Sequence, residues 1–262
     1  MPSQLNNFSL KPLLDYSLHL ADNVLILGHR NSEWTGHGPI LEQDIALSNI
    51  ALDLVGQSRN FYQYAAELKS DGSTEDTLAY FRDAPDFKNC LLVEQPNGDW
   101  GKTVLRQFVF STYQYYLYGQ LENCKEKRIA SIAEKSLKEV TYHIRWSSEW
   151  VIRLGDGTEE SHARMINALN TLWEFTDELF IPAQYEIEIA KNGITVDLPL
   201  INSSWNEKVK AVLQEATLPF PAVGQESKNS TAGGKEGRHT ENLDQILSEM
   251  QSLQRAYPGC DW

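Results

Sequence analysis

The chain has 262 residues, a formal net charge of −13 at pH 7, 41% hydrophobic residues and 10% aromatic residues. This composition is typical of a globular protein that is long enough to bury a sizeable core. The acidic balance argues against nucleic acid or an anionic membrane as a partner, because either would require a basic surface.

Three features of the sequence predict a cytoplasmic protein. The cysteines, Cys90, Cys124 and Cys260, are odd in number and far apart, which disfavours a disulfide framework or a zinc ribbon. The N-terminus shows no basic segment followed by an apolar run, so we expect no signal peptide. Apolar runs such as residues 24–27 are too short to span a membrane.

Apolar residues recur at helical spacing along most of the chain. In chain order, this periodicity predicts helices over 10–30, 40–68, 75–82, 102–121, 126–154, 159–180, 204–216 and 241–257. Asp99 and Thr158 are expected to cap the helices that follow them, and Ser203 or Ser204 is expected to cap the helix over 204–216. The helix over 102–121 is apolar almost all round, which is typical of a central or interface helix.

The segments between these helices are loops or are ambiguous. Residues 28–39 carry Gly and Pro that break the first helix, and residues 87–93 are compatible with a short helix or an extended segment. Residues 185–190 alternate in polarity, and residues 191–197 predict a turn followed by an extended piece. Residues 219–237 are rich in Pro, Gly, Ser and Lys, which predicts a flexible loop before the last helix.

The pattern as a whole predicts a single all-α domain over 1–262. Four or five long helices joined by mostly short loops indicate an up-and-down helical bundle with additional C-terminal helices. The tyrosines at positions 113, 115, 116 and 118 are more typical of a core or a subunit interface than of a cofactor site.

One polar pair inside the helix over 126–154 decides how the bundle is interpreted. Glu139 and His143 are four residues apart and share one helix face, so they are either half of a metal site or a buried polar pair that binds nothing. Di-iron bundles use Glu-x-x-His, but Val140 stands three residues before His143. We therefore favour a hydrogen-bonded His143 in the core or at an interface.

Two Glu-x-x-His matches do occur elsewhere in the chain. The pair Glu159 and His162 falls in the first turn of a helix, and the pair Glu236 and His239 falls in a Gly-rich loop. Neither pair is placed in the middle of a helix that faces a core, so neither is expected to bind metal. The sequence also lacks the nucleophile elbow, the P-loop and the dinucleotide-binding glycine motif.

Four long strings carry a resemblance to a known family. They include L-A-D-N-V-L-I-L-G-H-R-N-S-E-W-T-G-H-G-P from residue 20, L-L-V-E-Q-P-N-G-D-W over 91–100, S-S-E-W-V-I-R-L-G-D-G-T over 147–158 and G-R-H-T-E-N-L from residue 237. On these strings, and over nearly the whole chain, the sequence resembles the family of C-type subunits of the multicomponent phenylacetyl-CoA epoxidase (ring 1,2-epoxygenase).

The resemblance implies a fold, an activity and partners. It implies a ferritin-like helical bundle that acts as a structural, non-catalytic subunit and stabilises a catalytic A-type subunit. The A-type subunit would hold the di-iron centre and the acyl-CoA, and a reductase would deliver electrons from NADPH. The complex would insert one oxygen atom from O2 into the aromatic ring of phenylacetyl-CoA, a step of aerobic phenylacetate catabolism. No cofactor is expected in this chain.

The resemblance also implies where the metal ligands of the catalytic sister would align. Leu54 and Gln57 stand at its first Glu-x-x-His, and Val140 and His143 stand at its second, so only the histidine at 143 is kept. Ser111 or Phe110 is our best match for the ligand on the third helix, while the position on the first helix is not assigned. We therefore predict no catalytic, cofactor-binding or metal-binding residue.

Two alternatives belong to other functional classes. The chain would be a metal-dependent oxidoreductase in its own right if His143, Glu139 and carboxylates such as Glu33, Asp44 or Asp53 formed a metal site. It would be a free-standing binding or storage bundle if it had no oxygenase partner. Metal content and co-purification with an A-type chain distinguish these alternatives from the structural subunit.

Overall fold

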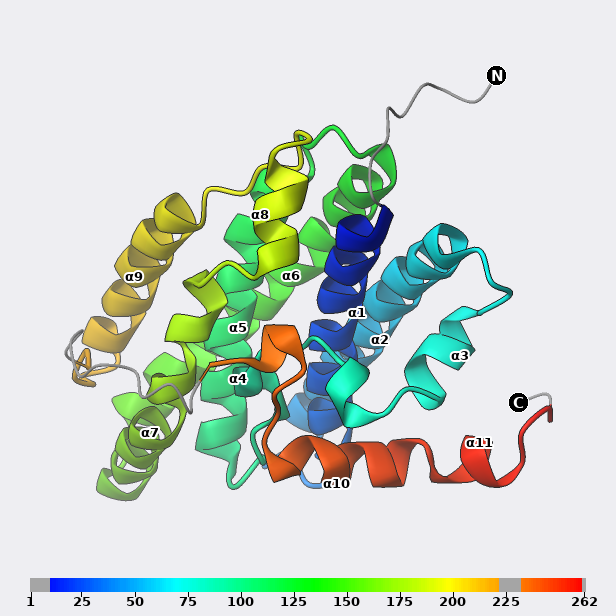
Figure 1. Cartoon of the computed structure of the whole chain (residues 1–262). Coiled ribbons are helices and arrows are strands. Elements are labelled where there is room, and N and C mark those ends of the chain that lie inside the picture. Colours follow the sequence, from blue (N-terminus) through cyan, green and yellow to red (C-terminus); the bar gives the residue numbers. More distant parts are fainter. Residues whose placement is uncertain (1–9, 222–231, 261–262) are drawn as a thin grey trace.

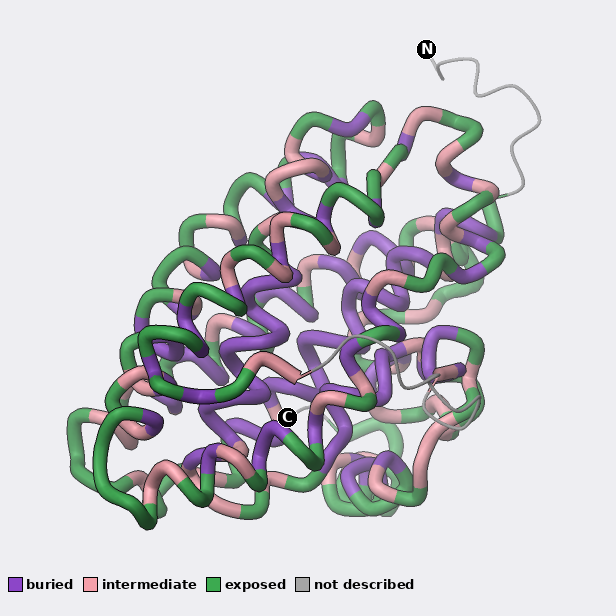
Figure 2. The backbone as a smooth tube through the Cα atoms, turned by 90° about the vertical axis from the view of Figure 1, so that its left-hand side faces the viewer, coloured by how far each residue is buried: buried purple, intermediate pink, exposed green. Residues whose placement is uncertain are grey.

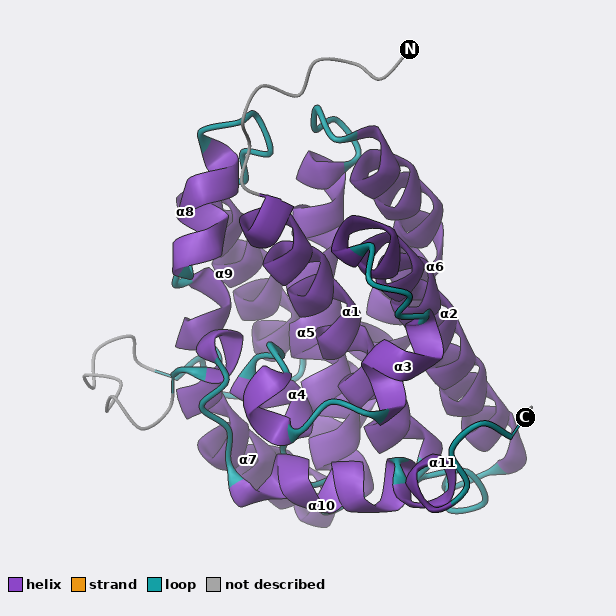
Figure 3. Cartoon of the chain, turned by 45° about the vertical axis from the view of Figure 1, so that its right-hand side comes forward, coloured by secondary structure: helices purple, strands orange, loops and turns teal. Residues whose placement is uncertain are grey.

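The computed structural model describes residues 10–221 and 232–260, and within them every regular element is helical (Figure 3). The α-helices are α1 (Leu10–Ser32), α2 (Leu41–Lys69), α3 (Glu75–Tyr80), α4 (Leu91–Glu94), α5 (Trp100–Leu121), α6 (Lys127–Gly155), α7 (Glu159–Leu172), α8 (Gln184–Ala190), α9 (Leu198–Glu215), α10 (Glu241–Met250) and α11 (Ser252–Ala256). Short 3-10 helices are η1 (Ala84–Asp86), η2 (Trp173–Phe175), η3 (Asp177–Phe180) and η5 (Gly234–Glu236). The predicted all-α class is confirmed.

Four long helices form the bundle. Helix α1 packs along α2, and α5 packs along α6, while α7 and α9 cover α5 and α8 covers α1 (Figure 1). Buried residues gather on the inner sides of these helices, and exposed residues lie along the outside (Figure 2). Within the described segments, no helix combines the length and apolar character needed to cross a lipid bilayer.

The two central helices follow directly from their composition. Along α5, side chains that point in every direction are buried, including Val104, Phe108, Ser111 and Tyr118. A helix without a polar face cannot lie on a surface without exposing apolar area, so it takes the middle of the bundle. Helix α6 is amphipathic instead, with Val140 and Val151 buried on one face.

Capping side chains set where several helices begin. Asp99 Oδ1 accepts a hydrogen bond from the Lys102 backbone N–H at 2.9 Å, and Thr158 forms a capping box with Ser161, as predicted. The predicted start of the helix over 204–216 is wrong, and neither Ser203 nor Ser204 caps it. Asp197 caps α9 instead, and the helix begins at Leu198. The proline at 199 fits there because the first turn of a helix leaves backbone N–H groups without partners in any case.

Other predicted boundaries also need correction. Residues 185–190 form part of α8 rather than an alternating strand, because Tyr185 and Ile189 are one helical turn apart and both turn inward. The α-helix predicted over 159–180 ends at Leu172, and the short 3-10 helices η2 and η3 follow it. There, Thr176 Oγ1 donates to the Trp173 carbonyl at 2.7 Å, and this local bond competes with regular helix geometry. The last predicted helix divides at Gln251 into α10 and α11.

The C-terminal strap is defined here as residues 232–256. It begins beside α4 with η5, and its helices α10 and α11 run across the lower end of the bundle in Figure 1. Gln251 Nε2 donates to the Ala79 carbonyl in α3 and to the Arg82 carbonyl just after α3, each at 3.0 Å. Residues 222–231 of the predicted flexible loop lie outside the described residues. At the end of that loop, Gly234 is so tightly packed that a Cβ would lie 2.3 Å from the Asn89 carbonyl oxygen. This end of the predicted loop is the 3-10 helix η5 (Gly234–Glu236), and its flexibility stays a prediction.

Candidate functional site

The centre of the bundle holds the positions that align with metal ligands of the catalytic sister. Leu54 of α2 and Val140 of α6 are fully buried and apolar, so neither can ligate a metal ion. Gln57 and His143 are also buried, with exposures of 1% and 0%. Polar atoms at this depth require partners, and these partners determine what the site can do.

A network of mostly neutral groups links α2, α5 and α6. Gln57 Nε2 donates to Glu139 Oε2 at 2.9 Å, and Gln57 Oε1 accepts from Gln114 Nε2 at 2.8 Å. The Gln114 amide also donates to the Tyr118 hydroxyl at 2.9 Å. The network contains a single carboxylate, that of Glu139, which accepts from an amide and is only half-buried, so water can solvate its charge without a cation.

His143 binds a different partner from Glu139, although the two share a helix face. His143 Nε2 lies 3.0 Å from Asp53 Oδ2, and the Asp53 side chain is 38% exposed. Because a carboxylate accepts, Nε2 is the protonated ring nitrogen, and the buried Nδ1 has no hydrogen-bond partner. The predicted hydrogen bond of His143 to a protein group is therefore present.

A second chain of amides connects α1 to α5. Asn31 Nδ2 donates to Gln107 Oε1 at 2.6 Å, and Gln107 Nε2 donates to Ser111 Oγ at 2.7 Å. Ser111 and Phe110, the residues matched to the third-helix ligand, are both buried. Ser111 thus serves as a hydrogen-bond partner within the core.

These residues do not fit a di-iron centre. Such a centre takes a Glu from each of two helices and a Glu-x-x-His from each of the other two. In the part of the chain that the structure describes, no three His, Cys, Asp or Glu side chains come together in a way that could hold a metal ion. Amide groups and apolar side chains occupy the centre instead.

The other carboxylates considered for a metal site lie apart from it. Glu33 pairs with Arg30 at 3.0 Å near the end of α1. Asp44 Oδ1 accepts the Gly36 backbone N–H at 2.8 Å and so shapes the loop before α2. The structure brings Asp53 to His143 but leaves Glu33 and Asp44 with these separate structural partners.

The two Glu-x-x-His matches also have structural partners. His162 Nδ1 lies 2.7 Å from the Gly155 carbonyl at the end of α6. His239 Nδ1 lies 2.8 Å from Glu94 Oε2, and its Nε2 lies 2.9 Å from the Phe87 carbonyl. Since both partners of His239 accept, both ring nitrogens donate, and the ring is an imidazolium. Burial lowers its pKa, but the hydrogen bond and charge of Glu94 outweigh burial and raise the pKa above the ordinary value.

His239 belongs to a buried ionic cluster that sequence reasoning missed. We call this set the anchor cluster, and its members are Glu94, Glu178, Glu186, Lys235 and His239. The cluster holds the C-terminal strap to the bundle. Its members come from segments as far as 145 residues apart, so no local motif reveals them. The available signal was an acid within an otherwise apolar stretch, as in L-L-V-E over 91–94.

Each carboxylate of the anchor cluster accepts hydrogen bonds from at least two donors. Glu178 accepts the backbone N–H groups of Leu91 at 2.6 Å and of Gly233 and Gly234 at 2.7 Å each. Lys235 Nζ lies 3.0 Å from Glu186 Oε2 and 2.9 Å from the Ile181 carbonyl. Charges buried in this way are tolerated because they are paired and hydrogen-bonded.

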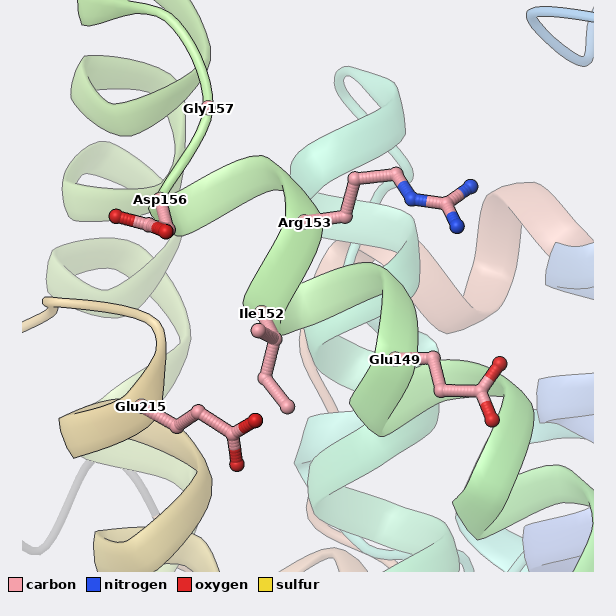
Figure 4. A pocket seen from close by; sticks show the side chains of 6 residues that line it. All are labelled: Glu149, Ile152, Arg153, Asp156, Gly157 and Glu215. Atoms are coloured by element: carbon pink, nitrogen blue, oxygen red, sulfur yellow. The ribbon is translucent and has the colours of Figure 1, made fainter.

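The surface carries an open hollow of about 600 Å³ between the ends of α6 and α9. In Figure 4, the carboxylates of Asp156 and Glu215 lie on one side of α6, and that of Glu149 lies on the other. The acids therefore do not converge on a common point. All three residues are exposed, so this hollow is a solvated surface feature and lies apart from the amide network of the core.

Comparison with known proteins agrees with the sequence resemblance. The chain is 46% identical over 253 residues to the C-type subunit of 1,2-phenylacetyl-CoA epoxidase from Escherichia coli (strain K12), an alignment that covers 97% of this chain and 100% of that protein. The family model for phenylacetic acid catabolic protein matches residues 1–262. The chain therefore belongs to the phenylacetic acid catabolic protein family.

Proposed function

We propose that this chain is the structural C-type subunit of a cytoplasmic phenylacetyl-CoA epoxidase and that it stabilises the catalytic A-type subunit, which holds the di-iron centre. The identity of 46% over the full length of the corresponding Escherichia coli epoxidase subunit supports the assignment to this complex. The observation that carries the non-catalytic role is the buried centre, where Leu54, Gln57 and Val140 replace ligating residues.

Physical chemistry explains why such a centre suits a supporting subunit. A cluster of buried carboxylates without a cation would cost several kcal/mol for each group or would force the groups to protonate. The amides of Gln57 and Gln114 avoid this cost because they are neutral. The bundle can therefore fold and present its outer surface to a partner without first acquiring metal.

The test is to produce the full chain alone and together with an A-type chain and the reductase. We expect a stable complex with the A-type chain, epoxidation of phenylacetyl-CoA, and stoichiometric iron in the A-type chain only. The substitution His143→Ala should leave turnover by the assembled complex within about twofold of wild type, since His143 makes no contact with reacting atoms.

Two results would oppose this proposal. Stoichiometric iron in the isolated chain, combined with oxidation activity that His143→Ala abolishes, would identify a metal-dependent oxidoreductase in its own right. Failure to associate with any A-type chain, despite a correctly folded bundle, would identify a free-standing module instead.

A further inference from the structure

The dipeptide Asn-Gly occurs twice in the chain, at residues 97–98 and at residues 192–193. In this dipeptide the asparagine side chain can react with the next backbone nitrogen, because glycine has no side chain that hinders the approach. Both glycines have a positive φ, 65° at Gly98 and 91° at Gly193, so both pairs lie in turns. The two pairs share the same local chemistry, and their surroundings decide whether they react.

The side chain of Asn97 is held at both of its polar atoms. Its Nδ2 donates to the Arg30 carbonyl and to Glu33 Oε2, each at 2.7 Å, and its Oδ1 accepts from Arg106 Nη2. Arg106 is fully buried, so the loss of this acceptor leaves a buried guanidinium group short of a partner. A reaction that draws the Asn97 amide toward the Gly98 nitrogen and expels Nδ2 has to break all of these bonds.

The side chain of Asn192 is far less constrained. It is exposed, and within the described segments its one hydrogen bond runs from Nδ2 to the Glu188 carbonyl at 3.0 Å. The Gly193 N–H donates to the Ala190 carbonyl at 3.1 Å, at the end of α8, which has only seven residues. The terminal turn of a short helix opens at little cost in free energy, and this opening frees both the amide and the Gly193 nitrogen.

We propose that Asn192 is a site of spontaneous deamidation and that Asn97 is protected from it by its hydrogen bonds. The Gly193 nitrogen loses its proton to a base in the solvent and forms a bond to Asn192 Cγ. The bond from Cγ to Nδ2 breaks, and ammonia leaves. Water then opens the resulting succinimide ring at either carbonyl carbon, which yields aspartate or isoaspartate. One water is consumed and one ammonia is released, and no oxidant or reductant takes part.

Deamidation at Asn192 changes the contact between this turn and the segment before α6. The Lys125 N–H donates to the Gly193 carbonyl at 3.4 Å, two residues before α6 begins. Isoaspartate places one additional atom in the backbone at residue 192 and so displaces the Gly193 carbonyl from this bond. Either product also adds a negative charge to a chain whose net charge is already −13.

The experiment incubates the full chain in mildly alkaline buffer, folded in one sample and unfolded in urea in another. After digestion at low pH, mass spectrometry follows the peptides that contain Asn97 and Asn192, since each deamidation adds about 1 Da. In the folded chain, Asn192 should react within about tenfold of its rate in urea. Asn97 should react at least about 100-fold more slowly than its own rate in urea, because charged hydrogen bonds have to break.

A substitution tests whether hydrogen bonds provide the protection. Glu33→Ala removes one charged partner of the Asn97 amide and should speed deamidation of Asn97 in the folded chain by about tenfold, while Asn192 keeps its rate. The matched control Glu149→Ala, at an exposed acid on α6, should change neither rate. Circular dichroism verifies that both variants are folded. The proposal is overturned if Asn192 reacts no faster than Asn97 in the folded chain, or if Glu33→Ala leaves the rate at Asn97 unchanged.

Discussion

At the scale of single residues, the anchor cluster contains one of the buried ion pairs of the chain, between Lys235 and Glu186. The Lys235 side chain is 4% exposed and its partner Glu186 is 10% exposed, whereas Lys11, in an ion pair with Asp15, is 76% exposed. Both pairs are short, but water screens only the exposed one. The two lysines therefore make very different contributions to stability, although both sit in ion pairs.

Replacing Lys235 with Met should expose this difference. The substitution leaves Glu186 buried without its cation, and we expect the free energy of unfolding to fall by about 3–5 kcal/mol. The matched control Lys11→Met should change it by less than about 1 kcal/mol. Urea unfolding monitored by circular dichroism measures both values, and equal losses would show that burial of the pair is unimportant.

His239 should make stability depend on pH. Its pKa is raised in the folded chain, so its contribution is fully present below the unfolded pKa of about 6.5 and is lost as pH rises through the folded pKa. We expect His239→Gln to destabilise the chain most near pH 6 and progressively less at higher pH. Thermal unfolding of both proteins across this range provides the measurement, and a difference that grows with pH would contradict the assignment.

At the scale of elements, helical periodicity predicted the long helices because each buries a continuous apolar face. It failed at α8 and at the start of α9, where short segments satisfy both helical and alternating patterns. The aligned positions Leu54 and Val140 are buried, but the contact of His143 with Asp53 spans 90 residues. Such pairings depend on how helices are arranged in space, and no local pattern encodes that arrangement.

The end of α6 offers a test of how closely two helices approach. A Cβ on Gly155 would lie 2.4 Å from the Ala216 carbonyl oxygen just after α9, whereas a Cβ on Gly119 of α5 would meet nothing within 4 Å. Gly155→Ala should therefore destabilise the chain by about 1–3 kcal/mol through overpacking. Gly119→Ala should stabilise it by about 0.5–1 kcal/mol. Denaturant titration of both variants tests this contrast in sign, and the same sign for both would refute it.

At the scale of the whole molecule, the C-terminal strap provides hydrogen-bond partners for side chains that are buried inside the bundle. It supplies donors to two fully buried carboxylates, since Thr240 N and Oγ1 reach Glu94 at 2.7 and 2.8 Å, and Gly233 and Gly234 reach Glu178. Without the strap, both carboxylates would lack most of their partners. We therefore expect the bundle core and the strap to unfold as one cooperative unit.

Ending the chain at residue 231 should disrupt this unit. We expect a lower melting temperature and binding of a hydrophobic dye, because the apolar side chains and acids under the strap become exposed. A chain that ends at residue 257, after α11, keeps every described contact of Glu94 and Glu178 and should melt like the full chain. Differential scanning fluorimetry compares the three proteins, and similar melting of the shortest one would contradict the role of the strap.

The position of the strap also sets an order of events during synthesis. Glu94 emerges from the ribosome about 145 residues before His239, its partner, and Glu178 emerges about 55 residues before Gly233. Until the strap has been synthesised, these acids have to stay hydrated, and the apolar helices around them have to stay partly open. Contacts of such long range close slowly, so the nascent chain passes through a stage in which its interior is accessible to chaperones and to premature association.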